Sequence, residues 1–168
     1  PTVLENRFVV RDFGQGLSPK EVNYFFAMYG ASDKRESNDY IGSWGLGAKA
    51  SFAIVDSFTV TSFYKGKKTV YNLYIDETEL GKIAKISEED SNEPSGIELS
   101  LAVNSYEISR FVTEALDLIR HIKVKPIVKG IAKIPDYPKP ILQGNSWRYF
   151  GDSHSKVIMG QISYPIDV

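Results

Sequence analysis

The chain of 168 residues contains no cysteine and only two histidines. Without cysteine it forms no disulfide and offers no thiolate to a metal, which fits a reducing compartment. His121 and His154 have no acidic neighbour at the spacing of metal ligands, so we expect both to be surface or packing residues. No apolar run approaches the ~20 residues needed to cross a bilayer, so we expect no membrane span.

An excess of charge is also missing. The formal net charge is −1, which predicts no basic surface for nucleic acid. Apolar residues make up 42% of the chain and charged residues 24%, ordinary values for a chain that can bury a core. The chain begins at Pro1 without a methionine, so we expect it to be a fragment with sequence missing upstream.

The length fits one domain with a short extension. The proline-rich stretch from Pro135 to Pro140 is typical of a boundary or turn. It predicts one domain over residues 1–134 and, over residues 135–168, a C-terminal β extension or the start of a following domain.

Runs of β-branched and aromatic residues between turn residues predict strands, and apolar residues at helical spacing predict helices. Glycine in the turn Lys65–Lys68 predicts a hairpin with positive φ. The predicted strands are Phe8–Val10, Ser57–Tyr64, Thr69–Ile75, Lys82–Ile86, Gly96–Val103, Ile127–Ile134, Trp147–Phe150 and Val157–Ser163. The predicted helices are Pro19–Tyr29 with Ser18 as N-cap, a short buried one over Lys49–Val55, and an amphipathic one over Tyr106–His121. The predicted loops are Gly30–Tyr40 and the acidic Ser87–Ser95.

Two glycine clusters about thirty positions apart carry the chemistry. The first is Asp-Phe-Gly-Gln-Gly over residues 12–16, directly after the strand Phe8–Val10. A carboxylate at the end of a strand can accept a hydrogen bond from an exocyclic amine such as that of adenine. Gly14 and Gly16 lack Cβ, so the backbone can turn sharply and allow a flat base to approach. Alone, this pattern is more often a tight turn after a strand than a binding site, and only together with the second cluster does it favour the functional interpretation.

The second cluster is Gly-Ser-Trp-Gly-Leu-Gly over residues 42–47, followed by the predicted helix that begins at Lys49. Successive glycines can direct several N–H groups into one concavity, and a following helix N-terminus favours phosphate. Lys49 lies in the first helical turn, where it could add a full positive charge. A Walker A loop is excluded because its Gly-Lys-Ser/Thr ending is absent, and a dinucleotide-binding fingerprint fits poorly because no long strand precedes Gly42.

Both clusters resemble motifs of the GHKL ATPases, a superfamily that contains gyrase B, the Hsp90 chaperones, histidine kinases and MutL. Asp12–Gly16 resembles its adenine-binding motif, Ile41–Gly47 its lid-anchoring motif, and Ala31–Lys34 part of its ATP lid. A closer resemblance is to the N-terminal region of rIIA-like proteins of large tailed phages, lysis-inhibition accessory proteins with a predicted ATPase domain. It runs from about Val3 to the end of the chain. The segments that carry it are Arg7–Gly14, Glu36–Gly42, Gly45–Lys49 and Ile162–Asp167.

The resemblance implies an α+β fold: a two-layer α/β sandwich, the Bergerat fold, with a mixed, largely antiparallel sheet. It implies ATP as ligand, Mg²⁺ bridging the phosphates in the complete protein, a mobile lid over Gly30–Ser43, and closure with homodimerisation on ATP binding. It further implies a cytoplasmic location, that of the host cell for a phage-encoded protein. The implied nucleotide-binding residues are Asp12, Gly14, Gly16, Lys34, Gly42, Gly45, Leu46, Gly47, Lys49 and Ser95.

Two features depart from the superfamily. Its water-activating glutamate and Mg²⁺-binding asparagine lie several tens of residues before the first motif, so we expect the catalytic glutamate and the N-terminal part of the fold upstream of Pro1, and no metal ligand within this chain. Glu5 and Asn6 lie too close to the strand to be this pair. The later Gly-Thr motif becomes Gly96-Ile97, and Ser95 either lends the hydroxyl or is plain loop.

Two functions therefore remain open from the sequence. The first is an ATP-binding domain that switches conformation with ATP and whose hydrolysis needs the upstream residues. The second is a catalytically inactive GHKL-fold interaction scaffold that binds nucleotide weakly or not at all. A third, a DNA-associated protein similar to MutL or a topoisomerase, finds no support in the charge balance.

Overall fold

The computed structural model describes residues 1–2, 4–27, 49–78, 80–121, 125–131, 139, 141–144, 148–149, 156–159 and 162–165. The chain forms two compact units, one of Glu5–Asn104 and one of Pro1–Leu4 with Ser105–Val168. Each unit is described by itself. Within the described residues, no helix is both long enough and apolar enough to cross a membrane. The predicted division into residues 1–134 and 135–168 stays a prediction.

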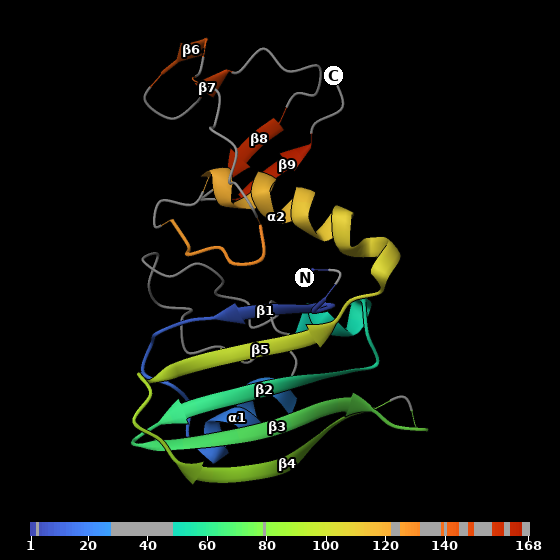
Figure 1. Cartoon of the computed structure of the whole chain (residues 1–168), viewed down its shortest axis with the longest axis vertical. Helices are drawn as coiled ribbons and strands as arrows, with labels where there is room; N and C mark the ends of the chain where they lie inside the picture. Colours follow the sequence, from blue (N-terminus) through green and yellow to red (C-terminus); the bar gives the residue numbers. More distant parts are fainter. Residues whose placement is uncertain are drawn as a thin grey trace. The chain divides into compact units, whose positions relative to one another are not determined.

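The unit Glu5–Asn104 is built on one antiparallel sheet of five strands (Figure 1). The strand order is β1-β5-β2-β3-β4, and every pairing in it is antiparallel. The strands are β1 (Arg7–Arg11), β2 (Ser57–Tyr64), β3 (Lys67–Ile75), β4 (Gly81–Asp90) and β5 (Gly96–Ala102). This sheet, together with its helices, confirms the predicted α+β class, and each of the five strands overlaps a predicted strand, although β4 extends beyond its predicted end.

Lys65 and Gly66 form the turn between β2 and β3, because Tyr64 pairs directly with Lys67. Both turn residues have positive φ, 48° at Lys65 and 74° at Gly66. Two successive residues of this kind make the tight turn whose twist matches that of paired strands. The predicted glycine turn is therefore confirmed, and it is shorter than the four residues expected.

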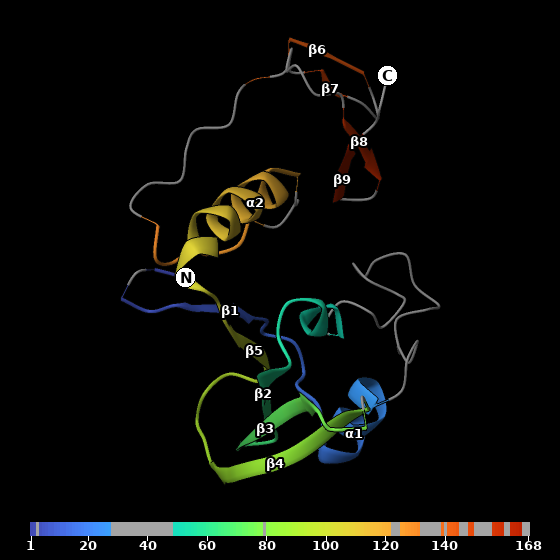
Figure 2. The ribbon, with the colours of Figure 1, turned by 90° about the vertical axis from the view of Figure 1, so that its right-hand side faces the viewer.

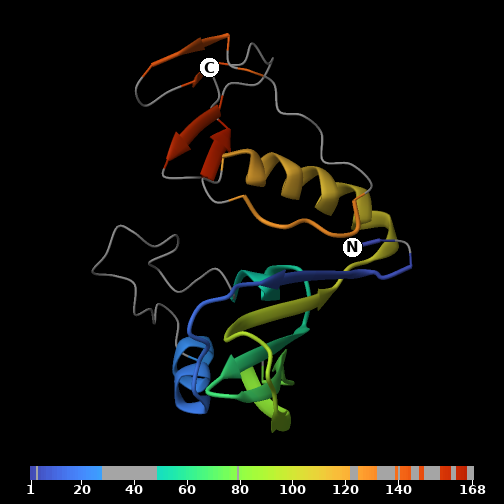
Figure 3. The same ribbon diagram turned by 60° about the vertical axis from the view of Figure 1, so that its left-hand side comes forward.

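The strand register divides the sheet into a covered face and a polar face. Residues directly opposite each other share a face, so the pairs Val60↔Tyr71 and Phe58↔Leu73 lie on one side. These four side chains are at most 3% exposed. Helix α1 (Pro19–Ala27) covers this side (Figures 2 and 3), with Val22 fully buried.

The start of α1 is fixed by its own side chains. Ser18 and Glu21 form a reciprocal pair: the Ser18 N–H donates to Glu21 Oε2 at 2.7 Å, and the Glu21 N–H donates to Ser18 Oγ at 3.4 Å. This capping box satisfies two amides of the helix start, and the hydrogen bonds to Ser18 lower the pKa of Glu21. The predicted N-cap is confirmed, with Pro19 as the first helical residue.

Two expectations in this unit are wrong in part. Residues 87–90 are not loop but the last four residues of β4, where they pair with β3 and two of them lie opposite lysines. Lys67 Nζ lies 2.6 Å from Asp90 Oδ1, and Lys68 Nζ lies 3.1 Å from Glu89 Oε1. The segment after Lys49 is a short 3₁₀ helix, η1 (Lys49–Ala53), and it is not buried as a whole, since Ile54 just beyond it is 50% exposed.

The second unit contains η2 (Ser105–Glu107), α2 (Ile108–His121) and two short hairpins. The helix confirms the amphipathic pattern predicted for it. The hairpins are β6 (Leu142–Gln143) with β7 (Arg148–Tyr149) and β8 (Lys156–Met159) with β9 (Ile162–Pro165). The strand predicted over Ile127–Ile134 is wrong for residues 127–131, which form no strand, while residues 132–134 lie outside the described residues.

Candidate functional site

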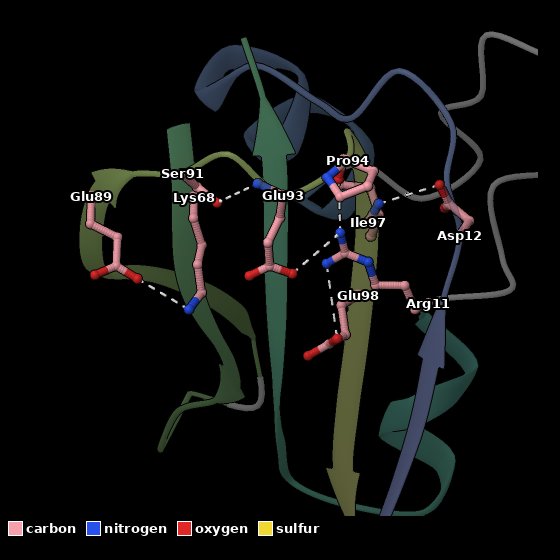
Figure 4. Close-up of polar contacts among 9 residues, drawn as sticks. All are labelled: Arg11, Asp12, Lys68, Glu89, Ser91, Glu93, Pro94, Ile97 and Glu98. Carbon is pink, nitrogen blue, oxygen red and sulfur yellow. Dashed lines mark hydrogen bonds and ion pairs between the residues drawn. The ribbon is translucent and has the colours of Figure 1, made fainter. Parts of the chain in front are cut away.

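Asp12 lies where β1 ends and the chain turns toward α1. Its backbone N–H donates to Ile97 O at 2.9 Å, which extends the β1–β5 ladder by one residue. Its side-chain Oδ1 accepts two backbone N–H groups, from Gly14 at 2.8 Å and from Ile97 at 3.3 Å (Figure 4 draws the second). Neither bond uses Oδ2. The exposed carboxylate is thus oriented through one oxygen, and the other remains an acceptor for a ligand's donor.

Gly96 lets β5 start directly against Asp12. It has φ of 144°, and a Cβ at this position would lie 2.1 Å from the carbonyl oxygen of Asp12. Only a residue without a side chain permits so close an approach of two backbones. Ile97, where the superfamily's motif has threonine, contributes its backbone N–H to Asp12 instead of a hydroxyl. Ser95 is exposed and immediately precedes this contact.

The far end of the Asp12–Gly16 turn is fastened to β2. Gly16 is buried with φ of 73°, and a Cβ there would lie 2.1 Å from Phe63 O. One residue on, Ser62 Oγ both donates to Leu17 O at 2.7 Å and accepts from Leu17 N at 3.0 Å. The turn is therefore held at both ends, by β5 through Asp12 and by β2 through Ser62.

Arg11 makes a contact set that the sequence did not predict. Its side chain is 14% exposed, its Cζ lies 3.4 Å from the centroid of the Phe63 ring, and its Nη2 donates to Pro94 O at 2.8 Å. Glu93 and Glu98 lie at ion-pair distances of 3.8 and 4.0 Å (Figure 4). The sequence carries one sign of this: a charged residue ends an apolar strand beside the candidate aspartate. Ser62 was missed likewise, although it is a polar residue at an inward-facing position of β2.

The structure brings together four of the predicted site residues, Asp12, Gly14, Gly16 and Ser95, at the end of the sheet where β1 stops and β5 begins. The remaining predicted site residues cannot be placed relative to these four. Lys34, Gly42, Gly45, Leu46 and Gly47 lie outside the described residues, and of Lys49 only the backbone, at the start of η1, is described. The convergence of the two glycine clusters on one cavity therefore stays a prediction.

The described end of the sheet offers a hydrogen-bond acceptor and no metal-ligand cluster. Asp12 Oδ2 is an acceptor beside Gly14, which carries no side chain. Within the described ranges, no three side chains among histidine, aspartate and glutamate gather as metal ligands would. A magnesium ion here would depend on the phosphates it accompanies, as is usual for this cation.

The comparisons with known proteins agree with this geometry. The family described as histidine kinase-, DNA gyrase B- and HSP90-like ATPase matches residues 2–105, more than half of the chain and the whole of the five-stranded sheet. The chaperone protein HtpG of Buchnera aphidicola subsp. Cinara cedri (strain Cc) is similar, with 31% identity over 116 residues. That alignment covers 61% of this chain and 18% of HtpG, so the chain corresponds to less than a fifth of that relative. The α+β sheet, the turn centred on Asp12 and the family match lead to one conclusion: the chain belongs to the family of histidine kinase-, DNA gyrase B- and HSP90-like ATPases.

Proposed function

We propose that this chain is the ATP-binding domain of a GHKL-type ATPase, and that ATP binding switches its conformation in the complete protein. The observation that carries the proposal is the geometry of Asp12. Two backbone amides hold one carboxylate oxygen, and the second is available to accept the amino group of adenine. A carbonyl at that position of the base would face the carboxylate with no hydrogen to donate.

The base lies, in this proposal, beside Asp12 on the helix-covered side of the sheet. Gly14 carries no side chain beside the Asp12 carboxylate, so the ring can lie close to the backbone there, while Gly96 allows β5 to start directly against Asp12. Gly16, fastened to β2, keeps the turn in this form with no ligand present.

The phosphates are assigned to the second glycine cluster. The backbone N–H groups of Gly42, Gly45, Leu46 and Gly47 would surround them, Lys49 would add charge, and Lys34 would reach the terminal phosphate when the lid closes. Magnesium, when bound, would neutralise part of the phosphate charge, and we assign it no ligand from this chain. Hydrolysis would also need a base that activates water, and we assign that role to none of the residues proposed here.

The remaining parts of the proposal concern the whole protein. We infer an origin among the phage rIIA-like proteins from Arg7–Gly14 and the other matching segments, with a location in the cytoplasm of the host cell. We also infer ATP-dependent association of two copies, as the resemblance implies. Both inferences rest on sequence likeness.

Calorimetric titration with Mg-ATP and Mg-ADP tests the proposal. Asp12→Asn keeps an oxygen for the amides of Gly14 and Ile97 but can present an NH₂ to the amino group of adenine. The loss of a charged hydrogen bond, about 1.5–3 kcal/mol, predicts roughly 10- to 150-fold weaker ATP binding. Asp56→Asn removes the same charge just before β2, at the end of that strand away from Gly16, and is expected to leave the affinity unchanged.

The alternative, a scaffold of the same fold, makes the opposite prediction. A wild-type chain that gives no heat at millimolar nucleotide, even with its upstream sequence restored, would rule out the ATP-binding proposal and leave the scaffold. Equal affinity of wild type and Asp12→Asn would show that nucleotide binds elsewhere.

A further inference from the structure

The guanidinium of Arg11 is enclosed on the polar face of the sheet. It stacks on the Phe63 ring at 3.4 Å and lies 5.4 Å from the Phe13 ring. Its hydrogen bond to Pro94 O, at 2.8 Å, joins positions 83 residues apart in the sequence. A planar, permanently charged fork suits this combination of ring stacking and carbonyl binding, whereas a lysine ammonium does not.

The turn that Arg11 holds leads directly to a partner of Asp12. Pro94 is followed by Ser95 and Gly96, and then by Ile97, whose N–H donates to Asp12 Oδ1. Arg11 is itself the neighbour of Asp12. The backbone and these two hydrogen bonds therefore close a ring that begins at the side chain of Arg11 and ends at the carboxylate beside it (Figure 4).

The weaker bond of this ring is the one at the carboxylate. The distance from Ile97 N to Asp12 Oδ1 is 3.3 Å, beyond the usual range for an N–H···O bond. A shift of a few tenths of an ångström in the Pro94 turn would break it. The carboxylate of Asp12 would then keep only its bond to the Gly14 amide, two residues away, and could rotate.

Arg11 lies on the face of the sheet opposite the proposed nucleotide site. Successive residues of an extended chain point to opposite faces, and Arg11 shares its face with its register partner Glu98. Its contacts, to Phe63, Pro94 and the two glutamates, all lie on that side. Its influence on the base therefore passes through the Pro94–Ile97 segment.

We infer that Arg11 is a positioning residue that, through the Pro94–Ile97 turn, holds the Asp12 carboxylate in the orientation that distinguishes a 6-amino purine from a 6-oxo purine. The inference rests on the proposed function. It adds that base selectivity depends on a residue on the opposite face of the sheet.

The test compares dissociation constants for ATP and inosine triphosphate, which carries a carbonyl where ATP carries the amine. Wild type is expected to prefer ATP by about 10-fold or more, the effect of one charged hydrogen bond. Arg11→Met keeps an apolar stem over Phe63 and removes the fork, and we expect this preference to fall by at least about 3-fold. Loss of general structure would weaken both nucleotides and leave their ratio unchanged.

Arg7→Met is the matched control. Arg7 lies four residues earlier on the same strand and face, its side chain is 57% exposed, and its ion pair with Glu5 is 3.8 Å long. We expect the Arg7 variant to keep the ATP preference of wild type. Should Arg11→Met fail to fold, Arg11→Lys carries the test, with a preference expected to lie below that of wild type.

A second measurement needs no nucleotide. The Ile97 amide is expected to exchange its hydrogen faster in Arg11→Met than in wild type or Arg7→Met, as read by NMR. A wild type that binds no nucleotide would refute the proposed function, while faster Ile97 exchange would still support the link between Arg11 and Asp12. An unchanged nucleotide preference in a folded Arg11 variant, or an unchanged Ile97 exchange rate, would overturn the inference.

Discussion

Substitutions at Gly16 and Gly66 form a matched pair that tests whether the Asp12–Gly16 turn packs against the end of β2. Their φ angles are nearly equal, 73° and 74°, but their surroundings differ. A Cβ on Gly16 would lie 2.1 Å from Phe63 O and 2.9 Å from Phe63 C, while a Cβ on Gly66 would meet nothing within 4 Å. Replacing each with alanine therefore adds the same backbone strain at both positions and a steric conflict at only one.

The magnitudes follow from these distances. Alanine in the left-handed region costs about 1–2 kcal/mol, and its smaller unfolded-state entropy returns roughly 0.4–1 kcal/mol, so we expect Gly66→Ala to destabilise by about 1 kcal/mol. At Gly16 the Phe63 carbonyl would also have to retreat by at least about 1.3 Å to restore an ordinary contact. Forcing a group into a packed site costs about 1–3 kcal/mol more. Gly16→Ala is therefore expected to lose about 2 kcal/mol beyond Gly66→Ala.

Urea denaturation of the wild type and both variants measures the difference. A fall in the midpoint with an unchanged slope reports a change in the free energy of unfolding. If the two variants agree to within about 0.5 kcal/mol, the Asp12–Gly16 turn does not rest against the end of β2. If Gly16→Ala also weakens ATP binding and Gly66→Ala does not, the packing of this turn against β2 contributes to nucleotide binding.

Two further substitutions test the turn and the acidic end of β4. Ser62→Ala removes the hydroxyl that bonds both backbone groups of Leu17 and is expected to cost about 1–3 kcal/mol in urea denaturation; a cost under about 0.5 kcal/mol would contradict this anchoring role. The hydrogen bond and charge of Lys67 lower the pKa of Asp90 below its ordinary 3.8, so Asp90 contributes stability above that pH and loses it as pH falls through the lowered value. At neutral pH we therefore expect Asp90→Asn to have a lower urea midpoint than wild type. We expect this difference to become smaller below pH 3.8 and in high salt. A difference that persists in acid would contradict the ion pair.

The sequence was sufficient where a structural cause is local. The strand Ser57–Tyr64 was predicted with its observed bounds because β-branched and aromatic residues fill it and a glycine turn ends it. The N-cap at Ser18 and the turn after β1 are likewise encoded within a few residues. Asp12, Gly14 and Gly16 could be named as candidates for the same reason.

The remainder depends on residues distant in the chain. The acidic residues 88–90 are typical of a loop in the sequence, and they are strand in the structure, where they pair with residues 67–69 of β3 and two of them form ion pairs with lysines. The bond from Ile97 to Asp12 spans 85 positions, and the bonds between Ser62 and Leu17 span 45. No local pattern reports such a partner, so the contacts that orient the aspartate were not predictable, although the aspartate was.

The two carboxylate oxygens of Asp12 have different roles, and this affects what an aspartate at this position indicates in other members of the family. One oxygen serves the backbone and the other is left for the ligand, so the turn is preorganised and its ordering does not subtract from affinity. Because the same oxygen also stabilises the turn, the aspartate can be retained for folding even where no nucleotide is bound. An aspartate at this position in a relative therefore points to a bound base only where its second oxygen is also left free of backbone partners.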